Sequence, residues 1–134
     1  MRWAWILFCC FRLAAGDVGQ LRQLASSHRF FELRRALEEP GGNAAETLFY
    51  RGLVACRFGH EADCIKLLRQ FLAKQPSPEM AAAAHGEMGL ALERMGRLKE
   101  AWQALSDSLA LMSKDDSSRG AIENTLLLMD SLSD

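Results

Sequence analysis

The feature that most constrains the fold of this chain is an internal repeat. Residues 52–73 and 89–110 align at an offset of 37 residues, with seven identities among 22 positions. The identical pairs are Gly52/Gly89, Leu53/Leu90, Arg57/Arg94, Gly59/Gly96, Leu68/Leu105, Leu72/Leu109 and Ala73/Ala110. A repeat period of about 20–50 residues is typical of stacked repeat architectures. The repeat therefore constrains the fold strongly, and the function much less, since one scaffold serves many functions.

Length and composition fit one domain of packed helices. The chain has 134 residues, of which 49% are hydrophobic, and only three are proline. Its 16 basic and 17 acidic residues leave a net charge of −1, without the clustered positive field that phosphate backbones require. The basic group Arg29, Arg34 and Arg35 is interrupted by Glu32, as on a solvated helix face. We expect no nucleic-acid partner.

Residues 1–16 resemble a short secretory signal peptide. Arg2 precedes the apolar run 3–11, and small residues follow at 14–16. The run is far shorter than the roughly 20 apolar residues of a membrane-spanning helix. The resemblance predicts an exported protein, periplasmic or secreted. We expect no membrane contact beyond that of the signal peptide, which is then cleaved. The alternative is a cytoplasmic chain that packs a first helix into its core.

Helix-breaking residues divide the remaining domain, 17–134, into helical segments. Breaks fall at 40–43, Gly59, 76–77, Gly96 and 113–118. No segment alternates apolar and polar residues as a strand does. The sequence predicts an all-α fold with helices over 17–27, 30–39, 44–58, 61–75, 78–95, 98–112 and 119–132.

The repeated positions resemble the tetratricopeptide repeat, a motif of paired antiparallel helices. The first helix of the motif has a small residue midway along it, here Gly52 and Gly89, and a glycine follows at the turn. The second helix has a small residue, here Cys64 and Ala101, and then a large apolar one, here Leu68 and Leu105. Pro76 matches the proline that closes the motif. The resemblance implies an α-solenoid of six or seven helices, with a degenerate unit at 17–39, repeats at 44–76 and 78–113, and a closing helix at 119–132.

The chain departs from that motif in three respects. The period is 37 residues, not the family's 34, and Leu48 and His85 stand where the first helices usually carry an aromatic residue. Ser113 replaces the second closing proline.

A weaker resemblance links the chain to the N-terminal helical region of bacterial exported retropepsin-like proteases. It rests on residues 30–37, 49–52 and 119–125. Such proteases carry an Asp-Thr-Gly or Asp-Ser-Gly loop, and this chain has neither. The resemblance implies a docking or regulatory region of an enzyme whose catalytic domain is elsewhere.

Candidate chemistry is sparse. Cys56, His60 and Cys64 recur every four residues, but Gly59 breaks the helix and a fourth zinc ligand is missing. Cys56 and Cys64 either form a disulfide or stay as small buried thiols, and we favour the thiols. His28 and His85 stand alone, and no phosphate loop or nucleophile motif occurs. We expect no catalysis, no metal and no cofactor.

The tetratricopeptide resemblance implies a concave face lined by the first helix of each pair. The expected partner-binding residues are Glu46, Phe49, Leu53, Arg57, Leu90, Glu93 and Arg94, with Cys56, Ala83 and Gly86 beside them. The family's binders of chaperone tails use Lys and Asn where this chain has Phe49, Leu53, Gly86 and Leu90, so we expect a different protein or peptide partner.

Among the seven identical pairs of the repeat, only Arg57/Arg94 is not required by helix packing. They either grip a carboxylate or phosphate of a partner, or lie over the turn, solvated or bonded to helix-end carbonyls. The alternative to partner binding is a self-associating structural domain. The sequence predicts no particular oligomeric state.

Overall fold

The protein is described by a computed structural model that covers residues 18–38 and 45–132. These residues form α1 (Val18–Ser26), α2 (Phe30–Glu38), α3 (Ala45–Arg57), α4 (Glu61–Leu72), α5 (Pro78–Arg94), α6 (Leu98–Leu111) and α7 (Arg119–Leu132). They contain no strand, which confirms the all-α prediction for this part of the chain. None of these helices combines the length and the apolar character that crossing a bilayer needs. The predicted signal peptide, 1–16, lies outside the described residues.

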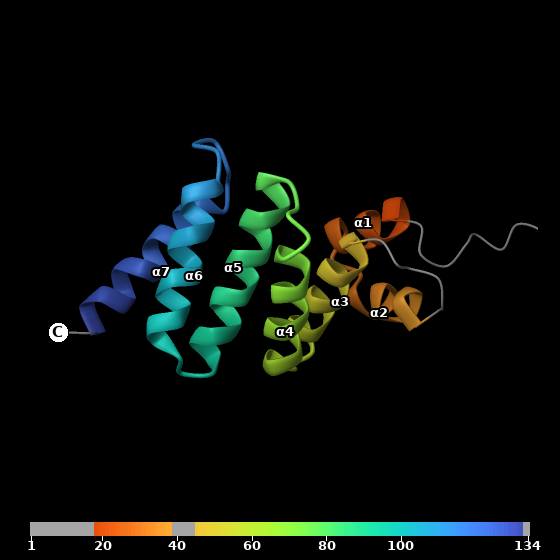
Figure 1. Ribbon diagram of the computed structural model, residues 1–134, viewed down its shortest axis with the longest axis horizontal. Coiled ribbons are helices and arrows are strands. Elements are labelled where there is room, and N and C mark those ends of the chain that lie inside the picture. The colour runs from red at the N-terminus through yellow and green to blue at the C-terminus, as the bar shows by residue number, and fades with distance from the viewer. Residues whose placement is uncertain (1–17, 39–44, 133–134) are drawn as a thin grey trace, which may run out of the picture.

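The helices follow one another in chain order, from α1 and α2 at one end of the molecule to α7 at the other (Figure 1). Neighbouring helices pack together, most extensively α3 on α4 and α5 on α6. One hydrophobic core runs through the stack, and even the short α1 and α2 contribute to it through Leu21, Leu24 and Leu33.

Three turns of this stack share one hydrogen-bond pattern. The backbone N–H of His60 donates to the Ala55 carbonyl at 2.8 Å, and Arg97 donates to Leu92 in the same way at 2.9 Å. Gly59 and Gly96 make these turns with φ values of 79° and 75°, a region that suits glycine. The α1–α2 turn repeats the pattern, but there His28 takes the positive φ, at 56°. This turn lacks the glycine that marks the other two, although the sequence predicted the helices on either side of it, 17–27 and 30–39.

The repeated glycines Gly52 and Gly89 lie where two helices approach closely. A Cβ atom on Gly52 would stand 2.8 Å from the side chain of Leu68, and one on Gly89 would stand 2.7 Å from that of Leu105. The repeat therefore preserves a packing contact, α3 on α4 and then α5 on α6.

Helix ends differ from the prediction most at α4. This helix ends at Leu72, not at residue 75, because Gln75 adopts a φ of 54° and Pro76 lacks the N–H that a continuing helix needs. The predicted ends at 17, 39 and 44 lie outside the described residues, and the other predicted ends lie within one residue of those observed.

Cys56 on α3 and Cys64 on α4 are joined by a disulfide. The preference for free thiols is therefore wrong. The turn at Gly59 folds α4 back along α3, which brings the two Cα atoms within 5.2 Å of each other, inside the range that disulfides require. The second unit has no such bond, since Glu93 and Ala101 occupy the corresponding positions.

Candidate partner-binding groove

A groove of about 320 Å³ opens between the N-terminal helices, α3, α5 and the start of α7. Its lining residues come from α1, α2, α3, α5 and α7, and from the segments that directly follow α1 and α6 or precede α7. They are Ala25, His28, Phe30, Phe49, Leu53, Arg57, Ala82, Ala83, Gly86, Glu87, Leu90, Met112, Ser118 and Ile122.

The floor of the groove is apolar and partly buried. Phe49 and Leu53 of α3 are each only 7% exposed, since both also belong to the core. Leu90 of α5 is more accessible, and Ala83 and Gly86 beside it leave room above the helix. The Gly86 position is backed by Ser108, whose buried hydroxyl donates to the Ala82 carbonyl at 2.7 Å and so fixes α6 against α5.

The charged residues in the groove are paired with each other. Both terminal nitrogens of Arg57 donate to the carboxylate of Glu87, at 2.9 Å each, which joins α3 to α5. The Arg57 guanidinium also lies 5.2 Å from the centre of the Phe30 ring, a cation–π distance. Two of its five N–H groups thus bind inside the protein, an arrangement that neither sequence interpretation considered.

Arg94, the repeat counterpart of Arg57, is also ion-paired, but it does not line the groove. Its Nε lies 3.2 Å from a carboxylate oxygen of Glu61 on α4. The two repeated arginines therefore tie consecutive helix pairs together in different directions, Arg57 forward to α5 and Arg94 back to α4.

Two other residues expected in the groove also lie outside it. Glu93 is exposed on α5. Glu46 accepts a hydrogen bond from Arg22 of α1 at 3.2 Å. Arg22 also bonds the side chain of Tyr50, which is almost fully buried. Burial raises the pKa of Tyr50, and the bond to Arg22 opposes that rise only in part.

The structure thus brings together Phe49, Leu53, Arg57 and Leu90 of the expected set, with Ala83 and Gly86. Sequence reasoning missed His28, Phe30, Glu87 and Ile122. Phe30 carries the periodicity of a core residue, and Glu87 meets Arg57 across 30 residues of chain, so a local pattern could identify neither.

Among the described residues, no three His, Cys, Asp or Glu side chains gather as metal ligands would. Comparisons of this chain with protein-family models, with curated proteins and with solved structures find no match.

Proposed function

We propose that this chain is a non-catalytic protein-interaction module, a tetratricopeptide-like solenoid that binds a protein or peptide segment in the groove between α3 and α5. The observation that carries the proposal is the groove itself, an apolar hollow of about 320 Å³ to which residues far apart in the sequence contribute. Pre-formed, mostly apolar hollows with a few polar groups are the usual form of a binding site.

The charges of the groove favour an uncharged ligand. Glu87 neutralises Arg57, and its side chain is only 18% exposed, so an acidic ligand would have to displace an internal carboxylate. An apolar or aromatic side chain would instead lie over Leu90, Ala83 and Gly86 without breaking any pair. We propose a segment whose central residues are large, apolar and uncharged.

Filling the groove tests this function. Ala83 is partly exposed on α5, so Ala83→Phe places a ring in the hollow without removing a core side chain. Ala110→Phe is the matched control, because Ala110 is exposed on α6 and does not line the groove. The assay is selection from a displayed library of random peptides, followed by direct binding of the enriched peptides.

Peptides selected on the natural chain should carry apolar centres, retain their affinity for Ala110→Phe, and lose at least about tenfold for Ala83→Phe, which is about 1.4 kcal/mol. Equal binding to both variants would place the site elsewhere.

We further propose that the protein is exported. The Cys56–Cys64 disulfide supports this location, because such bonds persist in oxidising compartments and are rare in the cytosol. Expression of the full chain in bacteria, followed by fractionation and N-terminal sequencing, tests it. A mature protein that begins near residue 17 is expected, and retention of Met1 in the cytosol would contradict the proposal.

A further inference from the structure

A second hollow, of about 390 Å³, lies between α4 and the turn that joins α5 to α6. It shares no lining residue with the groove between α3 and α5. Its floor includes Ile65 of α4, which is 4% exposed, and Met95 of the turn, which is 44% exposed. Methionine adapts its shape readily to an apolar partner. The floor therefore offers a contact for an apolar side chain.

Three basic side chains line this hollow, which we call the basic hollow: Lys66 and Arg69 of α4, and Arg97 of the turn. None of its described lining residues is acidic. One carboxylate outside the lining, that of Glu100, lies 2.6 Å from Arg97 and 3.4 Å from Arg69. The side chain of Lys66 makes no ion pair within the part of the chain that the structure describes. Because one carboxylate serves two arginines and the lysine has none, the basic hollow keeps an excess of positive charge.

This excess charge is accessible to a partner. The side chains of Arg69 and Arg97 are 56% and 42% exposed, and Lys66 is exposed as well. The acidic residues of α4, Glu61 and Asp63, do not line the hollow.

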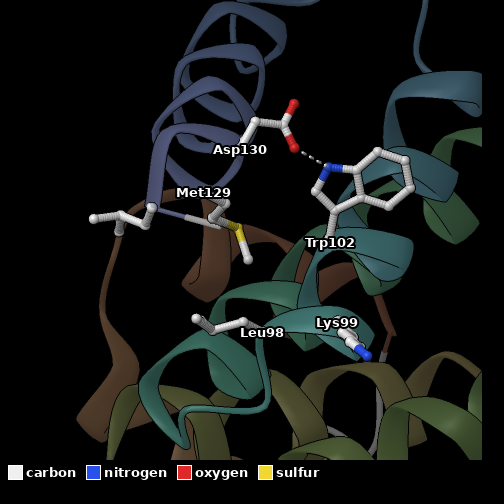
Figure 2. A pocket seen from close by; sticks show the side chains of 6 residues that line it. Leu98, Lys99, Trp102, Met129 and Asp130 are labelled. Atoms are coloured by element: carbon white, nitrogen blue, oxygen red, sulfur yellow. Dashed lines mark hydrogen bonds between the residues drawn. The ribbon is translucent and has the colours of Figure 1, made fainter. Parts of the chain in front are cut away.

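The next unit of the repeat has an equivalent hollow, of about 280 Å³, between α6 and α7. Figure 2 shows Lys99 and Trp102 of α6 with Met129 and Asp130 of α7, and the indole N–H of Trp102 donates to the Asp130 carboxylate at 3.0 Å. Lining residues of the two hollows correspond at the 37-residue offset, as Ala62/Lys99, Ile65/Trp102 and Met95/Leu132. A hollow at this position therefore follows from how the units stack, and needs no ligand to explain it.

The positive charge of the basic hollow is not required by that stacking. At the same offset, Lys66 and Arg69 correspond to Gln103 and Ser106. The lining of the second hollow has one basic and one acidic side chain, so it carries no excess of either sign. Equivalent helices thus pack with uncharged residues at both positions, and the charge needs another explanation.

We propose that the basic hollow binds an acidic segment of a partner protein. Carboxylates of the segment pair with Lys66 and Arg69, and a large apolar side chain beside them contacts Met95 and Ile65 on the floor. The excess positive charge and the apolar floor together favour this occupant. A nucleic-acid backbone would use the cations but not the floor, and it needs a wider positive field than three side chains supply. This site is separate from the groove, and the proposed binding in the groove does not depend on it.

Selection from a displayed peptide library, in which alternate residues are Glu or Asp, tests the basic hollow. The enriched peptides are titrated onto the full chain and its variants at physiological salt, which screens long-range charge effects. Lys66→Glu reverses one charge of the basic hollow and should fold, since Lys66 is exposed. Lys99→Glu is the matched control, because it reverses the charge of an exposed lysine in the equivalent hollow. Lys66→Arg keeps the charge.

The enriched peptides should carry large apolar residues at their free positions. They should lose at least about tenfold in affinity for Lys66→Glu, because like charges would then face each other. Their affinity for Lys66→Arg, Lys99→Glu and the groove variant Ala83→Phe should be retained. Higher salt should weaken their binding to the natural chain.

A library that yields no binding peptide overturns the proposal. Equal losses for Lys66→Glu and Lys99→Glu overturn it too, since they would show only a general effect of charge. A loss confined to Ala83→Phe would place acidic peptides in the groove instead. Single-stranded DNA and anionic lipid vesicles, added in parallel, should not displace the peptides. Binding of either one that Lys66→Glu abolishes would assign the basic hollow to phosphate groups and contradict a protein partner.

Discussion

At the residue scale, the pKa of Tyr50 can be measured without interference from other phenols, because it is the only tyrosine of the chain. Burial raises its pKa above the ordinary 10.0, so the folded state holds the phenolic proton more tightly than the unfolded state. The stability that this contributes is complete below pH about 10 and is lost as the pH rises through the folded pKa. Ultraviolet titration of tyrosinate should give a midpoint above 10.0 that falls to the ordinary value in urea. A midpoint unchanged by unfolding would contradict the buried environment.

The close approach at Gly89 predicts a destabilising methyl group. Gly89→Ala gains about 1 kcal/mol of helix propensity, but its Cβ would stand 2.7 Å from Leu105, and overpacking costs about 1–3 kcal/mol. We expect a net loss of up to about 2 kcal/mol.

Gly120→Ala is the control, because nothing lies within 4 Å of its Cβ position in α7. It should stabilise the protein by up to about 1 kcal/mol. Urea denaturation measures both variants, and an equal effect of the two would contradict the packing.

At the scale of elements, two kinds of link hold successive helices together, one covalent and one ionic. The disulfide between Cys56 and Cys64 closes a short loop, with a sequence separation of 8. Loop closure of this length accounts for about 2.5 kcal/mol of stability in the chain-entropy model. Cys64→Ala puts in this position the residue that the second unit carries, Ala101, so the packing change is small.

Thermal unfolding should show a lower midpoint for Cys64→Ala, and a similar drop for the natural chain in reductant. Reductant should leave the variant unchanged. A natural chain indifferent to reductant would show that the bond contributes no stability.

The ionic link between Arg57 and Glu87 should couple α3 to α5. It is bidentate and half-buried, whereas the pair Arg94–Glu61 has one contact at 3.2 Å. A double-mutant cycle with alanine at Arg57 and Glu87 should therefore give about 1 kcal/mol of coupling, at the upper end for surface pairs, and the cycle at Arg94 and Glu61 should give less than about 0.5 kcal/mol. The reverse order would mean that the second contact of Arg57 adds nothing.

At the scale of the whole molecule, stability should fall from the middle of the stack to its ends. α5 packs on both α4 and α6, and α1, α2 and α7 have fewer neighbours. Hydrogen exchange should therefore be slowest in α5 and α6 and fastest in α1, α2 and α7. Slow exchange in α7 would contradict this order.

The sequence by itself determined the helical class, the two repeated units and nearly every helix end, because these depend on local signals. Glycines at turns, prolines after helices and apolar residues at helical spacing act within a few neighbours. Gln75 and His28 are exceptions, since each makes a left-handed turn without a glycine.

Only the tertiary structure decided what those helices bring together. The ion pair of Arg57 with Glu87, the disulfide at Cys64 and the entry of Phe30 into the groove depend on how helix pairs stack. The exposure of Leu128 does too, because it depends on which of the described helices lie beside α7. Contacts between distant segments have no local signature, and it is these contacts that define the candidate site.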